Sequence, residues 1–185
     1  MKRDMVRIID KKTLCEGKFL KFMRIEYMDS SGVIREWESF ERVNCKGVVA
    51  IVPVTDKNEV LLIRQFRPPV NGYVIEFPAG LNDKKDTLKE AAERELLEEA
   101  GYAAREMLFL EEGPMSSGAS AEIMTVFLAR GLEFIGIGKR DETEDIEVLK
   151  VPIKDLASKL SALRSEGNYV DLKIYGLVEL AKKHL

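Results

Sequence analysis

Histidine, cysteine and tryptophan are scarce in this chain, and their scarcity limits the chemistry available to it. The 185 residues include one histidine, His184, two cysteines, Cys15 and Cys45, and one tryptophan, Trp37. We expect no catalytic role for His184 at the penultimate position, so a general base must be sought among the carboxylates. The cysteines could form one disulfide, but in a chain without an export signal two reduced thiols are expected.

Long apolar runs and a large net charge are also absent. No apolar run approaches the roughly 18 residues that a membrane-spanning helix needs, and the first twelve residues lack the apolar stretch of a signal peptide. The net charge of −3 gives no general attraction to nucleic acid or anionic membranes. We therefore expect a cytoplasmic protein, without nucleic-acid or membrane partners, that holds any anionic ligand with local arginines or a metal ion.

The composition is that of a globular α/β protein. Hydrophobic residues make up 45% and charged residues 33%, and the chain is long enough to bury a core as one domain, with or without a small appendage. Alternating patterns predict a hairpin of residues 19–28 and 33–43. Further strands are predicted at 47–54, 60–66, 73–77, 105–111, 123–129 and 146–151, and helices at 88–100, 153–165 and 169–183. This order suggests a mixed sheet covered by helices on both faces.

The predicted amino-terminal hairpin is rich in aromatic residues. They are Phe19, Phe22, Tyr27, Trp37 and Phe40. A free surface with this much aromatic area would be unusual, so we expect the hairpin to pack against another surface, such as a second copy of the chain.

Residues 80–102, GLNDKKDTLKEAAERELLEEAGY, hold the most specific pattern in the chain. Thr87 and Glu90 have the spacing of a capping box, and Gly101 stands where a left-handed glycine would end the helix. Two turns of this helix crowd together four charged residues: Arg94, Glu95, Glu98 and Glu99. Carboxylates crowded on one helix face bind hard divalent cations such as Mg²⁺. A solvated, charge-laced helix is the alternative.

Among these residues, Glu95 and Glu99 are the best candidates for principal metal ligands. They are four positions apart, so their side chains point the same way from the helix. Like charges at this spacing cost roughly 0.2–0.5 kcal/mol each when no cation offsets them.

The stretch resembles the Nudix box, GX5EX7REUXEEXGU, in which U is a bulky apolar residue. Eight positions match: Gly80, Arg94, Glu95, Leu96, Glu98, Glu99, Gly101 and Tyr102. Asp86 departs from the pattern, which has Glu there, and we expect a weaker salt bridge or cap at this position. The resemblance implies a Nudix-type α/β/α sandwich with a mixed sheet, at residues 46–185. It also implies an N-terminal antiparallel β subdomain at residues 1–45, for dimerisation and adenine contacts.

Segments outside the box resemble the ADP-ribose (ADP-sugar) pyrophosphatase branch of that family. They are Arg64-Gln65-Phe66-Arg67-Pro68-Pro69, Glu76-Phe77-Pro78-Ala79-Gly80, Gly17-Lys18-Phe19 and Trp37-Glu38-Ser39. The resemblance implies Mg²⁺-dependent hydrolysis of ADP-ribose to AMP and ribose 5-phosphate, with Mn²⁺ as the alternative cation. Another nucleoside diphosphate sugar or a dinucleotide is the alternative substrate, and an ADP-ribose-binding module without activity is the alternative function.

The substrate residues follow partly from chemistry and partly from this resemblance. A guanidinium group binds phosphate through a bidentate fork, which makes Arg67 a candidate pyrophosphate ligand, with a surface arginine in a turn as the alternative. The resemblance implies that adenine stacks between Trp37 and the partner subunit's Phe19 in a homodimer with swapped N-terminal strands. It also implies that Glu38 contacts adenine and Arg42 the phosphates. From the sequence alone, Trp37 would be a core or interface residue.

The resemblance also completes the metal site. It implies that the backbone carbonyl of Ala79 is a ligand. Glu98 is a third candidate metal ligand and is also a candidate catalytic residue. Arg94 would pair with the box carboxylates and fix their rotamers.

An acidic segment, residues 140–146, supplies the candidate general base. The resemblance implies Glu142 as the base and Glu144 as a further metal contact, and the two roles could be exchanged. A solvated run of charges is the alternative. Glu122 is a weaker candidate for contact with metal or phosphate.

Overall fold

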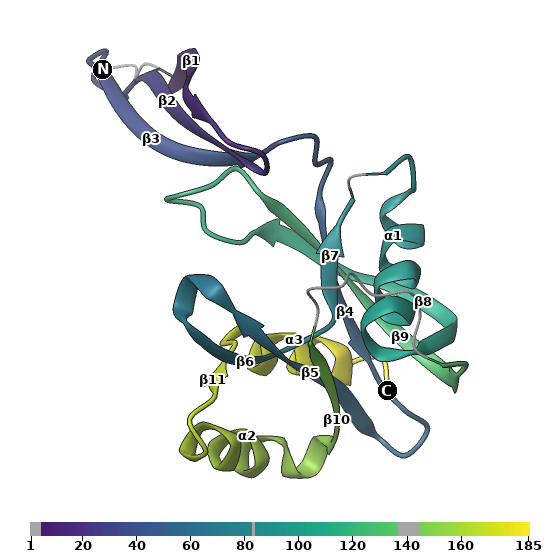
Figure 1. Ribbon diagram of the computed structural model, residues 1–185. Coiled ribbons are helices and arrows are strands. Elements are labelled where there is room, and N and C mark those ends of the chain that lie inside the picture. Colours follow the sequence, from purple (N-terminus) through teal and green to yellow (C-terminus); the bar gives the residue numbers. More distant parts are fainter. Residues whose placement is uncertain (1–4, 83, 137–144) are drawn as a thin grey trace.

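The computed structural model describes residues 5–82, 84–136 and 145–185, which form three β-sheets and three α-helices (Figure 1). The first sheet contains β1 (Arg7–Glu16), β2 (Leu20–Met28) and β3 (Ile34–Arg42). The second contains, in spatial order, β10 (Ile146–Pro152), β5 (Glu59–Arg67), β6 (Gly72–Glu76) and β11 (Tyr169–Val170). The third contains β7 (Ala79–Leu81), β4 (Val48–Pro53), β9 (Ile123–Phe134) and β8 (Tyr102–Pro114). The helices are α1 (Leu88–Glu95), α2 (Leu156–Ser165) and α3 (Lys173–Lys182), with short helical turns η1 (Pro68–Val70), η2 (Leu96–Ala100) and η3 (Ile153–Asp155).

The second and third sheets lie between α1 on one side and α2 with α3 on the other. Ala91 and Leu96 pack against Ile51 of β4 in one core, and Ile174 of α3 packs in the other core, which contains Val52. Adjacent strand residues point to opposite faces, so Ile51 and Val52 enter different cores. β9 pairs parallel with β4 and antiparallel with β8, which makes the sheet mixed. The predicted α/β/α fold class is therefore confirmed.

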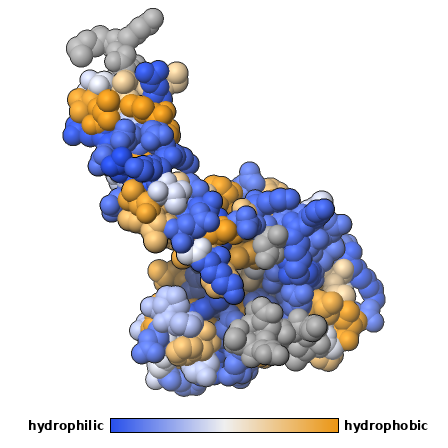
Figure 2. All heavy atoms as spheres, turned by 45° about the horizontal axis from the view of Figure 1, so that its top comes forward, coloured by the Kyte–Doolittle hydropathy of each residue, from blue (hydrophilic) through white to orange (hydrophobic). Residues whose placement is uncertain are grey.

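The first sheet projects from the rest of the chain as a separate antiparallel layer (Figure 1). β2 and β3 form the predicted hairpin, with Met28 opposite Ile34 at the turn. All ten residues of β1 are exposed, and large apolar side chains are exposed elsewhere in the layer, including Phe19 at 67% and Trp37 at 50%. Figure 2 shows apolar patches distributed along this projecting arm. Apolar surface of this extent marks an interaction site.

The last helix begins at Lys173 rather than at Tyr169, so that part of the sequence prediction is wrong. Tyr169 and Val170 instead form a short parallel strand beside Val74 and Ile75 of β6. Tertiary pairing with the sheet edge outweighs the local helical pattern there. None of the helices in the described ranges is long and apolar enough to cross a membrane.

Candidate active site

The helix of the box begins and ends as its sequence predicts. Thr87 Oγ1 accepts a hydrogen bond from the Glu90 amide, and the Glu90 carboxylate accepts one from the Thr87 amide at 2.8 Å, which forms the capping box. After Glu95 the helix continues as η2, a single π-helical turn that carries Glu98 and Glu99, and it ends at Gly101 with φ +80°. We call residues 88–100 the box helix. Short π-helical turns of this kind are frequent at functional sites.

Arg94 connects the carboxylates of the box helix to strand β7. Its Nη1 lies 2.6 Å from Glu95 Oε1 and 2.9 Å from Glu98 Oε2. Its Nη2 donates a hydrogen bond to the Leu81 carbonyl at 3.2 Å. These contacts restrict the rotamers of two carboxylates at once, which fixes their positions relative to the end of β7.

Asp86 reaches the same guanidinium group incompletely. Its Oδ2 lies 3.5 Å from Arg94 Nε, which is an ion-pair distance but too long for a good hydrogen bond. Arg94 Nε is buried and, within the described ranges, has no hydrogen-bond partner. The shorter aspartate at the position that departs from the box therefore leaves a buried donor poorly satisfied.

Gly80 makes room for a carboxylate of the box helix. A Cβ atom built on Gly80 would overlap the carboxyl group of Glu95. The backbone of β7 and the Glu95 side chain thus approach each other more closely than any residue with a side chain would allow. This contact explains why glycine opens the box sequence.

Glu99 is the most perturbed carboxyl group in the site. Its side chain is buried, with only 4% of the residue exposed, and its Oε2 accepts a hydrogen bond from the Ala79 amide at 2.8 Å. Burial raises the pKa of Glu99 to about 8; the Ala79 hydrogen bond and Arg67 oppose this shift, and Glu95 adds to it. A buried carboxyl group with such a pKa is typical of functional sites.

Arg67, at the end of β5, is held in place by Glu76 of the neighbouring strand. Arg67 Nε lies 2.7 Å from Glu76 Oε1. Burial raises the pKa of Glu76, and the hydrogen bond from Arg67 opposes the shift. Arg67 keeps 40% of its side chain exposed, so the guanidinium is positioned and still accessible to a ligand.

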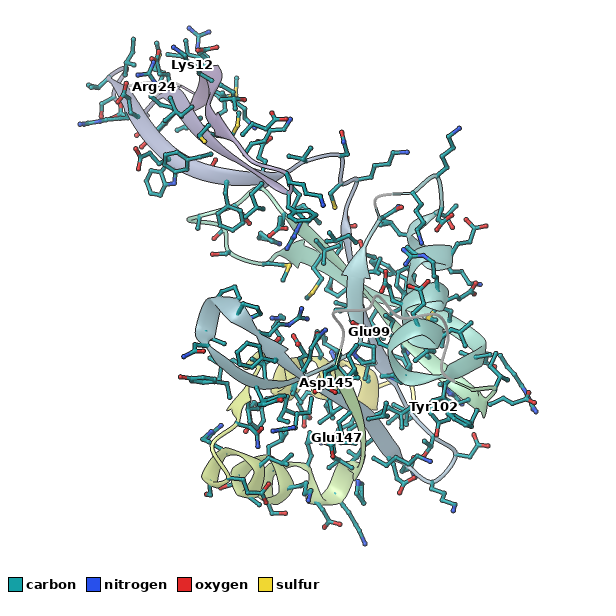
Figure 3. The ribbon with its side chains drawn as sticks, viewed as in Figure 1. Lys12, Arg24, Glu99, Tyr102, Asp145 and Glu147 are labelled. Carbon is teal, nitrogen blue, oxygen red and sulfur yellow. The ribbon has the colours of Figure 1, made fainter. Side chains whose placement is uncertain are left out.

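These groups line one cleft of about 750 Å³. Seven residues predicted from the sequence line it: Arg42, Arg67, Ala79, Arg94, Glu95, Glu98 and Glu99. Figure 3 shows Glu99 between the box helix and the sheet that contains β5 and β10. Carboxylates and guanidinium groups that converge in this way suit a phosphate-bearing ligand together with a cation.

The donor set fits a hard divalent cation. Within residues 5–82, 84–136 and 145–185, no three His, Cys, Asp or Glu side chains form a preassembled metal cluster. Arg94 instead lies against Glu95 and Glu98. The carboxyl oxygens of Glu95, Glu98 and Glu99 are nevertheless the kind of ligand that Mg²⁺ or Mn²⁺ prefers. Because the pKa of Glu99 is raised, a cation bound by its carboxylate would have to displace a proton below about pH 8.

The predicted adenine contacts lie on the projecting sheet. Trp37 Nε1 donates a hydrogen bond to the Gly118 carbonyl at 2.9 Å, which orients the half-exposed ring over the loop between β8 and β9. Trp37 lies opposite Ile25 of β2, and Phe19 comes just before Leu20, the first residue of β2. Phe19 and Ile25 are six positions apart, which is roughly 20 Å along a strand. Trp37 and Phe19 of one chain are therefore too far apart to stack on one base.

Of the remaining predicted site residues, some lie on β3 or next to it and two lie outside the described ranges. Glu38 is exposed on β3, opposite Arg24. Arg42 Nε donates a hydrogen bond to Glu122 Oε1, so Glu122 supports the arginine. Glu142 and Glu144 lie outside the described residues, and the described chain resumes at Asp145, labelled in Figure 3.

Five further polar residues line the cleft although no role was predicted for them from the sequence: Gln65, Glu76, Lys84, Asp171 and Lys173. Glu76 could have been recognised as a candidate site residue, because it is the charged residue within the otherwise apolar predicted strand 73–77. Asp171 and Lys173 belong to no motif, and they reach the cleft through the pairing of β11 with β6 and the packing of α3.

Comparison with known proteins places these observations in a family. The NUDIX domain family matches residues 46–171. The chain is 33% identical to the ADP-sugar pyrophosphatase of Mus musculus, over 96% of this chain and 87% of that protein. It is 28% identical to the ADP compounds hydrolase NudE of Escherichia coli, over 83% and 81% of the two chains. A crystal structure of an ADP compounds hydrolase superposes with a TM-score of 0.72 at 27% identity, covering 84% of each chain.

Lengthening Asp86 should strengthen the Arg94 contact. In Asp86→Glu, the added methylene brings a carboxylate oxygen within hydrogen-bonding distance of the buried Nε. We expect a gain in unfolding free energy of about 0.5–1 kcal/mol, measured by urea denaturation. Asp86→Asn, which keeps the short side chain and removes the charge, should be less stable than the wild type. An Asp86→Glu variant that is no more stable than the wild type would contradict this account.

The raised pKa of Glu99 should make the stability of the metal-free protein depend on pH. Between about pH 4.5 and 8, the native carboxyl group keeps a proton that the unfolded chain has lost, so stability should fall as pH rises, by at most about 1.4 kcal/mol per pH unit. Unfolding in EDTA across this range measures the slope. Glu99→Gln should remove this part of the slope, and Glu106→Gln, at an exposed position of β8, should not. Equal slopes in the wild type and Glu99→Gln would rule out the shift.

Proposed function

The chain belongs to the NUDIX family and is a pyrophosphohydrolase, and we propose that it hydrolyses ADP-ribose to AMP and ribose 5-phosphate with Mg²⁺ as cofactor. The observation that carries this proposal is the convergence of Glu95, Glu98 and the buried Glu99 with Arg67 in one cleft. The names of the relatives, ADP-sugar pyrophosphatase and ADP compounds hydrolase, support the choice of an ADP-linked substrate.

The cation would be held by Glu95, Glu98 and Glu99, with the Ala79 carbonyl and Glu144 as further ligands. A divalent cation bound there neutralises phosphate charge and lowers the pKa of water. Arg94 keeps two of these carboxylates in position, and Gly80 lets Glu95 approach β7.

The pyrophosphate would be bound by arginines that already have carboxylate partners. Arg67 is oriented by Glu76 and Arg42 by Glu122, and both arginines line the cleft. A positioned guanidinium loses little conformational freedom when it binds an anion, and it stabilises the charge that develops on the phosphate oxygens.

A carboxylate would act as the general base. We assign this role to Glu142 and the metal contact to Glu144, with the reverse assignment as the alternative. Either residue would take a proton from the attacking water. The single histidine, His184, is not among the residues that line the cleft, so it is not a candidate for this role.

The adenine would stack between Trp37 of one subunit and the partner subunit's Phe19, with Glu38 contacting the base. The separation of Trp37 and Phe19 along one hairpin supports a slot shared between two chains. The exposed apolar residues of β1 to β3 supply a surface on which such a homodimer could form. Residues 1–45 would then serve dimerisation and residues 46–185 catalysis.

Product analysis tests the proposed reaction. Purified protein with Mg²⁺ is offered ADP-ribose, ADP-glucose, GDP-mannose, NADH and FAD at equal concentration, and products are separated by chromatography. We expect AMP and ribose 5-phosphate to form fastest, and Glu99→Gln to reduce turnover by about 10³-fold or more because it removes a proposed ligand. Faster cleavage of another compound would overturn the substrate assignment. Binding of ADP-ribose without cleavage of any compound would favour a non-catalytic module.

Mixed dimers test the shared adenine slot. Trp37→Ala and Phe19→Ala should each raise KM for ADP-ribose by about 10-fold, because each removes one stacking surface. When the two variants are unfolded together and refolded, random pairing should restore high-affinity activity to about a quarter of the sites. Trp37→Phe should keep most of the affinity. A monomer by light scattering, or no restoration in the mixture, would contradict the shared slot.

A further inference from the structure

The loop between β8 and β9, residues 115–122, joins the projecting sheet to the rest of the chain. Within the described ranges, each hydrogen bond from residues 7–43 to another part of the chain ends in this loop. We propose that the loop positions the projecting sheet over the cleft, and that Glu122 is the positioning residue that couples Arg42 to Trp37. The inference rests on the proposed function, which gives these two residues their phosphate and adenine contacts.

Two hydrogen bonds to backbone carbonyls fix β3 along the loop. Trp37 Nε1 donates to the Gly118 carbonyl at 2.9 Å, and the Phe40 amide donates to the Ala119 carbonyl at 2.9 Å. Phe40 also forms an isolated parallel bridge with Ser120, so the loop pairs with β3 as a short extra strand would. Figure 1 shows the loop lying against β3. The loop therefore contacts β3 at Trp37, the residue that we propose stacks on adenine.

Glu122, at the last position of the loop, adds a charged contact. Its carboxylate accepts a hydrogen bond from Arg42 Nε. The side chain of Glu122 is 12% exposed and that of Arg42 is 35% exposed. Loss of one member of a partly buried ion pair leaves the other charge uncompensated, so the pair resists separation. Because Arg42 lines the cleft, Glu122 fixes the point at which β3 meets the cleft.

The loop is held in shape by its own hydrogen bonds, as a positioning element must be. The Met115 amide donates to the Glu122 carbonyl at 3.2 Å, which joins the two ends of the loop. The Ala119 and Ser120 amides both donate to the Ser116 carbonyl at 2.8 Å. Compact loops whose ends lie close together are frequently functional. Since Met115 also lines the cleft, this one loop contacts both the cleft and the projecting sheet.

The arrangement couples two binding groups that are distant from each other. Trp37 and Arg42 are five positions apart on β3, which is roughly 17 Å along a strand. Both are held by the same loop, and residues in one hydrogen-bond network respond to changes in each other. A change at Glu122 should therefore alter the surroundings of Trp37, although no hydrogen bond joins these two residues in the described part of the chain.

The fluorescence of Trp37 tests this coupling without any substrate, because Trp37 is the only tryptophan in the chain. Glu122→Ala removes the carboxylate that holds Arg42 and keeps the Gly118 carbonyl that Trp37 contacts. We expect acrylamide to quench the emission of this variant about 1.5- to 2-fold more efficiently than that of the wild type, because the loosened loop exposes the ring more often. Glu112→Ala removes the same charge from an exposed position of β8 and should be quenched as the wild type is.

Further variants show whether Glu122 acts through Arg42. Arg42→Ala should increase quenching as much as Glu122→Ala does, and the double variant should increase it no further. Glu122→Gln keeps an acceptor for Arg42 Nε and should stay close to the wild type. Unchanged quenching in Glu122→Ala, an equal increase in Glu112→Ala, or additive effects in the double variant would each overturn the inference. If thermal unfolding shows that Glu122→Ala fails to fold, the presence or absence of the increase in Arg42→Ala decides the question.

The kinetics of ADP-ribose hydrolysis give a second readout. Glu122→Ala should raise KM by about 10-fold and change kcat by less than about 3-fold, because it displaces binding groups and not the reacting atoms. A large fall in kcat with an unchanged KM would place Glu122 at the reacting atoms and overturn the positioning role. If the wild-type protein hydrolyses no ADP-ribose, the proposed function fails, and the quenching of Trp37 still decides whether the loop couples the two residues.

Discussion

The hydrogen bond from the Ala79 amide to the buried carboxyl group of Glu99 joins strand β7 to the last turn of the box helix. Burial raises the pKa of this group to about 8, and the nearby Glu95 adds to the shift. A fold that keeps a carboxyl group in this environment loses stability whenever the group is charged, unless a cation is bound beside it. The arrangement therefore makes sense as a site for a cation rather than as a contribution to stability.

Several features of the chain position the neighbours of Glu99. The absence of a side chain at Gly80 lets Glu95 reach β7, and Arg94 holds Glu95 and Glu98 with one guanidinium group. In the second sheet, Glu76 of β6 orients Arg67 of β5 toward the same cleft. Each contact joins the box helix or a sheet edge to the cleft, so the groups that we propose bind the pyrophosphate are already positioned in the chain itself.

The local parts of this account could be predicted from the sequence, whereas the parts that depend on packing could not. The box helix, its capping residues and the hairpin around Met28 follow from short-range patterns, and the structure confirms them. The strand at Tyr169 and Val170 could not be predicted from its own sequence, because its partner β6 lies almost a hundred residues earlier in the chain. Asp171 reaches the cleft through the same pairing. The shortfall of Asp86 was expected, but only the 3.5 Å distance to Arg94 Nε shows which donor it leaves unsatisfied.

Proton release on metal binding tests the central claim most directly. Calorimetric titration of Mn²⁺ into the metal-free protein, repeated in buffers with different ionisation enthalpies, counts the protons displaced at each pH. The account predicts release of close to one proton near pH 6.5, declining to none well above pH 8, because the cation replaces the proton of Glu99. Glu99→Gln should bind Mn²⁺ more weakly and release fewer protons. Binding without proton release, or the same release from Glu99→Gln, would contradict the claim that this carboxyl group is a metal ligand.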